Sequence, residues 1–137
     1  MKSKRRLKLK RVTMILITMI LVLATSAFAS NVRLDRKTAK LRDAQVVAHS
    51  EIHLTGATSG TEILGNYKGS VEVSIEYICI HKDTGEKVTL RNVYGNSKKI
   101  ELAANRPSSS YRSWRVRGTH TARYSGHTWT TNTEAFY

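Results

Sequence analysis

Cysteine and proline are nearly absent from this 137-residue chain. The one cysteine, Cys79, has no partner for a disulfide within the chain, so stability must come from packing of the core. Tyr77, Ile78 and Ile80 surround Cys79 in the sequence. This apolar setting predicts a buried thiol that does not react.

Glycine is absent from the first 55 residues, and the eight glycines then follow at short intervals. Such spacing leaves no room for long helices and is typical of strands joined by turns. The only proline, Pro107, falls in a loop over residues 105–109. The second half of the chain is therefore expected to be all β.

Enzyme motifs are missing as well. The sequence has no Gly-x-Ser-x-Gly elbow, no His-Glu-x-x-His pair, no glycine-rich phosphate loop and no cysteine cluster. Glu72 and Glu76 would share a strand face about 13 Å apart, too far for most paired-carboxylate chemistry. His49 and His53 have the same spacing, and His120 is expected to be a buried, hydrogen-bonded residue. We predict no enzyme activity, no catalytic residue, no cofactor and no metal.

The N-terminal segment has the order of a secretory signal peptide. Residues 1–11 carry seven Lys or Arg and no acid, Val12 to Leu23 is apolar apart from two threonines, and an Ala-Phe-Ala motif ends at Ala29. We predict cleavage between Ala29 and Ser30, which removes residues 1–29 and gives a secreted, extracellular protein. The alternative is an uncleaved leader that serves as a membrane anchor, which would be the only contact with a membrane.

The leader also carries much of the positive charge. The whole chain has 23 basic and 10 acidic residues, but seven of the basic residues precede residue 30, which leaves 16 against 10 and a net charge of +6. This balance favours an anionic surface such as a phosphate-rich wall polymer or a lipid headgroup layer, but the mixed signs along the chain argue against a dedicated polyanion binder. The expected partner is an anionic cell-surface polymer or another extracellular protein, and nucleic acid is not expected.

The remaining chain reads as a charged lead-in followed by short strands. Residues 30–44 lack glycine and place Leu34 and Leu41 one heptad apart, which indicates a helix or a disordered segment. Residues 45–137 contain seven apolar-polar alternations bounded by turn residues. The predicted strands are Gln45–Leu54, Thr61–Leu64, Val71–Ile80, Lys87–Tyr94, Lys98–Leu102, Ser110–Tyr124 and His127–Ala135.

Short strands that each have one apolar face need a second sheet to cover them. We therefore predict a single antiparallel, immunoglobulin-like β-sandwich of about seven strands over residues 45–137, with a small β-barrel as the alternative. A turn is expected at Tyr94–Ser97, and a loop at Gly56–Gly60. A monomer is expected.

One strand offers a candidate binding surface. Arg115, Arg117 and Arg123 fall on the same parity of the predicted strand, and guanidinium groups in a row suit phosphate or carboxylate groups. Trp114 falls on the opposite, apolar parity and is expected in the core. The position of Trp129 is less defined by the pattern.

The segment Trp114-Arg115-Val116-Arg117-Gly118-Thr119-His120 resembles a strand of an uncharacterised family of small secreted β-rich proteins of Gram-positive gut bacteria. The pair His49-Ser50 and the strand Val71–Tyr77 are similar to that family too. The resemblance implies a β-sandwich and no known activity. The sequence thus predicts a secreted, non-catalytic domain that binds an anionic extracellular ligand; the alternative is a small secreted antagonist, similar to a bacteriocin.

Overall fold

Eight strands make up most of the chain in the computed structural model, which describes residues 33–65 and 68–137. The predicted leader and its cleavage site at Ala29 and Ser30 lie outside the described residues. The strands are β1 (Arg33–Leu41), β2 (Ala44–Ile52), β3 (Gly56–Ile63), β4 (Gly69–His81), β5 (Lys87–Ser97), β6 (Lys99–Asn105), β7 (Tyr111–Tyr124) and β8 (His127–Phe136).

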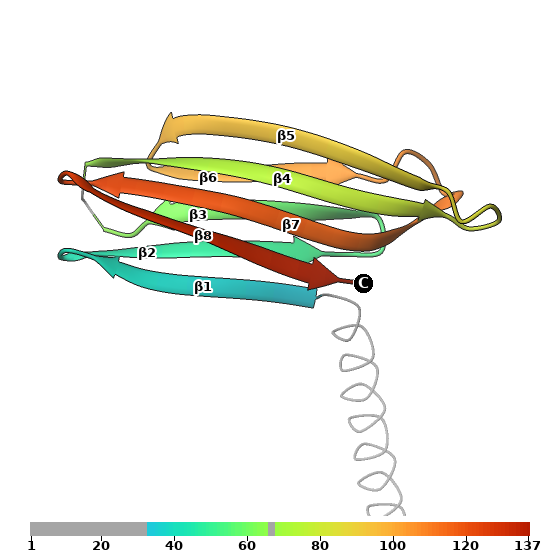
Figure 1. Ribbon diagram of the computed structural model, residues 1–137, viewed down its shortest axis with the longest axis horizontal. Helices are drawn as coiled ribbons and strands as arrows, with labels where there is room; N and C mark the ends of the chain where they lie inside the picture. Colours follow the sequence, from blue (N-terminus) through green and yellow to red (C-terminus); the bar gives the residue numbers. More distant parts are fainter. Residues whose placement is uncertain (1–32, 66–67) are drawn as a thin grey trace, which may run out of the picture. The chain divides into compact units, whose positions relative to one another are not determined.

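The strands form two antiparallel sheets that pack face to face. One sheet has the order β1-β2-β3-β6 (sheet A), and the other has the order β5-β4-β7-β8 (sheet B) (Figure 1). The sheets do not join into a closed barrel. The predicted β-sandwich is therefore confirmed, with eight strands in place of about seven.

The strand order follows the immunoglobulin-like pattern. All neighbours in the sheets are consecutive hairpins except β3–β6 and β4–β7. Immunoglobulin sandwiches have two equivalent long-range pairs, between strands B and E and between strands C and F. With β3 as strand B and β4 as strand C, β1 is an additional strand at the edge of sheet A.

Strand β1 corrects the prediction for residues 30–44. Residues 33–41 are neither helical nor disordered, but pair with β2 in unbroken register from Arg33 opposite Ile52 to Leu41 opposite Ala44. The sequence pattern did not predict this strand, because Asp35 is charged at a position that faces the other sheet, where an apolar residue is expected.

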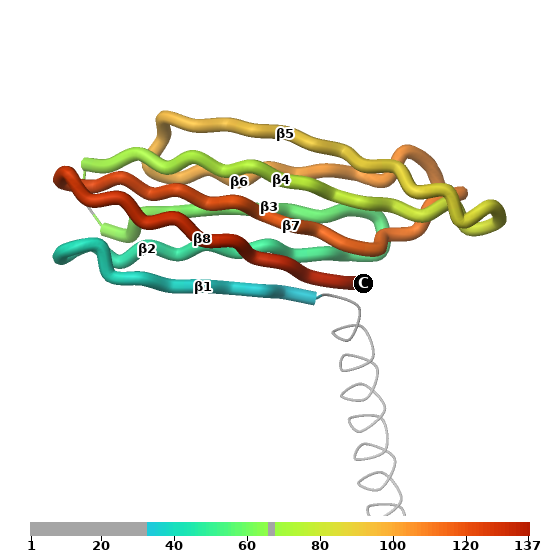
Figure 2. The backbone as a smooth tube through the Cα atoms, viewed as in Figure 1, coloured from blue at the N-terminus to red at the C-terminus, as the bar shows by residue number. Residues whose placement is uncertain are grey.

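Two inward side chains of β1 connect the edges of the two sheets. The Asp35 carboxylate accepts a hydrogen bond from the Glu134 backbone N–H at 2.9 Å, and Lys37 Nζ donates to the Asn132 carbonyl at 2.5 Å. β1 and β8 consequently lie side by side (Figure 2). Inward-facing charges of this kind protect sheet edges from pairing with other chains.

Two segments predicted as loop or turn belong to strands. β3 begins at Gly56, where its backbone lies close to β6. A Cβ at this position would lie 2.7 Å from the Ala104 carbonyl oxygen, so the close approach requires glycine. Glycine in a strand often marks such a close approach. β5 continues to Ser97 through a β-bulge at Asn96, whose φ of 67° lies in the left-handed region that Asn tolerates.

The core lies between the sheets. Its largest fully buried apolar side chains include Tyr77, Ile52, Ile63 and Ile75. Cys79 is fully buried among them, which confirms the predicted burial, and desolvation raises the pKa of its thiol.

A second bulge changes which tryptophan contacts the core. Opposite the step from Ile78 to Cys79, β7 contains one extra residue between Ser113 and Arg115. Ser113 therefore points inward, and Trp114 is partly exposed instead of buried as predicted. Trp129 packs against the core. The sequence parity was wrong for Trp114 because a bulge shifts the alternation by one residue.

Candidate functional site

The predicted arginine row lies on the outer face of sheet B, where two of its three members face carboxylates. Arg115 Nη2 lies 3.2 Å from Glu76 Oε1, and Arg117 Nη2 lies 3.1 Å from Glu134 Oε1. Arg91 of β5 adds a third contact, at 2.8 Å from Glu76 Oε2. The row is thus part of a band of alternating charges across four strands.

Each arginine of this band faces a carboxylate. The hydrogen bond from Arg91 is the main cause that lowers the pKa of Glu76, and burial acts in the opposite direction. Arg115 Nε is buried and lies 3.6 Å from Glu134 Oε1, beyond hydrogen-bond distance. Three arginines and two glutamates leave one net positive charge, so Arg115 and Arg117 do not form the free anion site that the sequence suggested.

Arg123 is different, because it lies at the end of the sandwich where four strand connections meet. Exposed cations of this end are contributed by β1, by the β1–β2 turn, by the residue before β4 and by β7. We call this set the turn end; it consists of Lys40, Arg42, Lys68 and Arg123.

Contacts between the connections hold the turn end together. Arg42 Nη1 donates to Ser125 Oγ at 2.9 Å, which joins the β1–β2 turn to the β7–β8 turn. Lys98 Nζ donates to the Gly65 carbonyl, which joins the β5–β6 connection to the end of β3. Figure 1 shows these connections on its left side.

None of the four cations forms an ion pair with a carboxylate of residues 33–65 and 68–137. In the part of the chain that the structure describes, every Lys–Glu or Arg–Glu ion pair involves Arg91, Lys99, Arg115 or Arg117, and none involves the turn end. Asp43 is the one acid in the same turn as Arg42. The turn end is therefore a set of exposed cations that form no ion pair with a carboxylate of the described residues, and Lys82, Arg106 and Arg112 at or near other strand connections form none either.

The sequence did not bring these residues together, because they are spread over 84 positions from 40 to 123. Each of them lies within three residues of a strand end. Proximity to strand ends identifies these residues as a group only when the strand order shows that the connections meet at one end of the sandwich. Of the predicted row, Arg123 alone belongs to this set.

A second polar cluster lies inside the molecule. His120 is fully buried; its Nδ1 lies 2.7 Å from Thr61 Oγ1 of sheet A, and its Nε2 lies 2.7 Å from Thr133 Oγ1. Thr133 Oγ1 continues to Ser50 Oγ at 2.6 Å, and Ser50 Oγ to Ser59 Oγ at 3.0 Å. The buried, hydrogen-bonded state predicted for His120 is confirmed.

Gly118 makes room for this cluster. A Cβ at residue 118 would overlap Ser59 Oγ, His120 Nε2 and Ser50 Oγ. The Thr61–His120 contact joins β3 to β7, the strands that correspond to B and F, where antibody domains carry their inter-sheet disulfide. In this protein, which has one cysteine, a polar contact joins the same two strands.

Burial controls the protonation of His120. Desolvation is the main cause that lowers its pKa from 6.5 to about 4, with a smaller contribution from His49. The ring is therefore neutral at pH 7, and each of its nitrogens has a hydroxyl partner. Ser50, Thr61 and His120 are inaccessible to solvent, and the contacts of the cluster tie the two sheets together.

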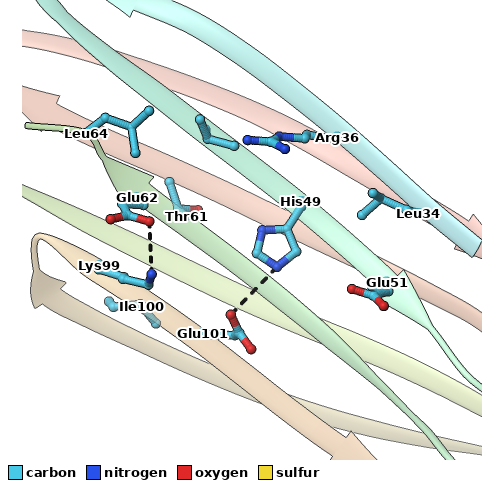
Figure 3. Close-up of a pocket in the computed structure, with 11 residues that line it drawn as sticks. Leu34, Arg36, His49, Glu51, Thr61, Glu62, Leu64, Lys99, Ile100 and Glu101 are labelled. Carbon is cyan, nitrogen blue, oxygen red and sulfur yellow. Dashed lines mark ion pairs between the residues drawn. The ribbon is translucent and has the colours of Figure 1, made fainter. Parts of the chain in front are cut away.

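A hollow of about 280 Å³ lies on the outer face of sheet A (Figure 3). Arg36, His49, Gly60 and Glu101 stand in register across its four strands. The His49 ring lies over Gly60, where a Cβ would be 2.6 Å from Cε1, and its Nε2 is 3.9 Å from Glu101 Oε2.

Charges of both signs surround this hollow, with three glutamates against one arginine and one lysine. Lys99 Nζ lies 3.0 Å from Glu62 Oε2 beside the His49–Glu101 pair. Arg36 and Glu51 complete the set. The hollow therefore has no excess of positive charge that would select an anion.

The described residues contain no group of three or more His, Cys, Asp or Glu that could hold a metal ion. His53 instead contacts Glu51, at 3.3 Å. Within residues 33–65 and 68–137, no helix has the length and apolar character needed to cross a bilayer.

Comparison with known proteins gives no match to a family model, a curated protein or a solved structure. The resemblance to a family of secreted proteins of Gram-positive bacteria therefore stays a prediction.

Proposed function

We propose that this protein is a secreted, non-catalytic β-sandwich domain whose turn end binds an anionic extracellular ligand. The observation that carries the proposal is the contrast between two groups of cations. Arg91, Arg115 and Arg117 face carboxylates, whereas the four cations of the turn end face solvent without any. A ligand that approaches the turn end meets positive charge that the protein does not compensate.

The ligand class follows from the chemistry of these side chains. Guanidinium and ammonium groups donate several hydrogen bonds and bind phosphate and carboxylate oxygens. Four exposed cations at three connections of one end can follow a flexible chain of repeating anionic groups. A phosphate-rich cell-surface polymer meets this requirement, and the N-terminal leader supports a location in which such polymers occur.

The position of the turn end supports a binding role. In antibody variable domains, the connections at one end of the sandwich form the binding surface and the sheets hold them in place. Here the contact between Arg42 and Ser125 fixes two of the connections relative to each other. The burial of the Ser50–Thr133–His120 cluster supports the non-catalytic part of the proposal.

The test measures binding of the protein to an immobilised poly(glycerol phosphate) polymer and to an uncharged glucan of similar length. Binding to the phosphate polymer should weaken steadily as the salt concentration rises, because salt screens contacts between exposed charges. The glucan should bind weakly or not at all. Equal binding to both polymers, or phosphate-polymer binding that does not respond to salt, would contradict the proposal.

A further inference from the structure

The end of the sandwich opposite the turn end exposes apolar side chains. Leu54 and Phe136 are each 51% exposed, Tyr137 is 40% exposed, and Trp114 is partly exposed. We call these four residues the apolar end. Large exposed apolar side chains that gather in one place usually mark a contact with a partner or a lipid surface.

Hydrogen bonds bring together the backbone segments that carry the residues of the apolar end. Ser113 Oγ donates to the Leu54 carbonyl at 3.1 Å, which holds the β2–β3 turn against the start of β7. The Tyr137 backbone N–H donates to the Trp114 carbonyl at 3.1 Å, and Phe136 stands opposite Arg115 in the register of β7 and β8. Three separate segments of the chain therefore meet there.

The composition of this surface suits the boundary between lipid and water. Tryptophan and tyrosine prefer the headgroup region of bilayers, where an aromatic ring meets both apolar and polar surroundings. Lys87 Nζ lies 3.9 Å from the centre of the Trp114 ring. A cation beside an aromatic ring can contact lipid phosphates while the ring contacts the acyl chains.

The path of the chain points to the same partner. Arg33, the first residue of β1, pairs with Ile52, which lies two residues before Leu54. The described chain therefore begins at the apolar end, and in the sequence it is preceded by the apolar run from Val12 to Leu23. In the alternative in which the leader is not cleaved, a leader held in a bilayer would keep the first residue of β1 close to the membrane.

We infer that the apolar end docks on the surface of a lipid bilayer, which directs the turn end away from the membrane. Trp114 and Tyr124 are ten residues apart on β7, so the two ends are separated by about 33 Å. This inference does not rest on the proposed function, because the apolar contact needs no anionic ligand.

The two tryptophans provide the test. Trp114 belongs to the apolar end, whereas Trp129 pairs with Ala122 and packs against the core near the turn end. Trp129→Phe leaves Trp114 as the one tryptophan, and Trp114→Phe leaves Trp129. Each full-length variant is combined with neutral phosphatidylcholine vesicles that carry brominated acyl chains, which quench only nearby fluorophores.

Trp114 should lose about half of its fluorescence in these vesicles, while Trp129 should keep nearly all of its own. Adding Phe136→Asp to the Trp129→Phe variant should restore the Trp114 signal, with an unchanged circular dichroism spectrum showing that the sandwich is intact. Equal quenching of the two tryptophans, or no quenching of Trp114, would overturn the inference. If Trp114 is protected from quenching and sedimentation shows a dimer, a second copy of the chain covers the apolar end, and the inference of bilayer docking is overturned as well.

Discussion

His120 Nδ1 lies 2.7 Å from Thr61 Oγ1, and this contact joins the two sheets across the core. It is the polar counterpart of a covalent inter-sheet bond in a chain with one cysteine. Thr133 and Ser50 extend the contact, so that the buried hydroxyls and the imidazole satisfy one another. Fully satisfied buried networks favour one arrangement of the packed layers over its alternatives.

Stability should depend on pH through His120. Its pKa is about 4 in the folded chain and near 6.5 when unfolded, so the unfolded chain binds the proton first as the pH falls. The free energy of unfolding should therefore decrease from pH 6.5 to pH 4 by about 3 kcal/mol, and change little above pH 7 for this reason. Urea unfolding at pH 7, 5.5 and 4.5 measures the change.

His120→Gln is the control for this pH dependence. It removes the titrating group, so the decrease between pH 6.5 and 4.5 should become much shallower than in the original chain. An equally steep decrease in the variant would show that other groups cause it.

Gly118→Ala should destabilise the sandwich by roughly 2 to 4 kcal/mol, because the new methyl group would overlap Ser59, His120 and Ser50 in a closed core. Gly95→Ala is the matched control; the nearest atom to its Cβ is Glu72 Cγ at 3.5 Å. Thermal unfolding of the two variants should separate them clearly. Similar melting temperatures would contradict the described packing around Gly118.

Glu76→Gln should cost more stability than Glu62→Gln. Glu76 has arginine partners on both sides, and one of them, Arg115, has a side chain that is only 22% exposed. Removing the carboxylate charge leaves Arg115 partly buried with a weaker partner, and about 1 kcal/mol is expected. The Glu62–Lys99 pair is more exposed, so Glu62→Gln should change the free energy of unfolding by close to zero. Chemical denaturation of both variants tests the difference.

Cys79 should react with a thiol reagent only when the protein unfolds, because its side chain is fully buried and burial raises the pKa of the thiol. Labelling should be slow in buffer and rapid in concentrated urea. Rapid labelling of the folded protein would show that β4 opens readily or that the thiol is exposed.

The sequence was sufficient for strands with regular alternation and insufficient where polar residues point inward. β4 could be recognised because Val71, Val73 and Ile75 share one face. β1 could not be recognised, since Asp35 and Lys37 face β8 at positions where the alternation of a strand predicts apolar residues. Such inward charges depend on contacts nearly a hundred residues away.

The same limit applied to the candidate site. The parity of Arg115 and Arg117 placed them on the outer face of sheet B, but the carboxylates opposite them depend on strand pairing. The bulge beside Trp114 is likewise invisible in the sequence pattern, although it reverses the inward and outward positions before Arg115. The turn end required the strand order, which the sequence did not specify.

The central claim is that uncompensated cations at the turn end bind an anionic ligand. Arg42→Ser with Arg123→Ser removes two charges there, and Arg91→Ser with Arg117→Ser removes two charges from the ion-paired band of sheet B. Affinity for poly(glycerol phosphate) is measured for both double variants at low salt. The account predicts a loss of roughly tenfold for the first and less than about twofold for the second. Equal losses, or a greater loss for the sheet B variant, would contradict it.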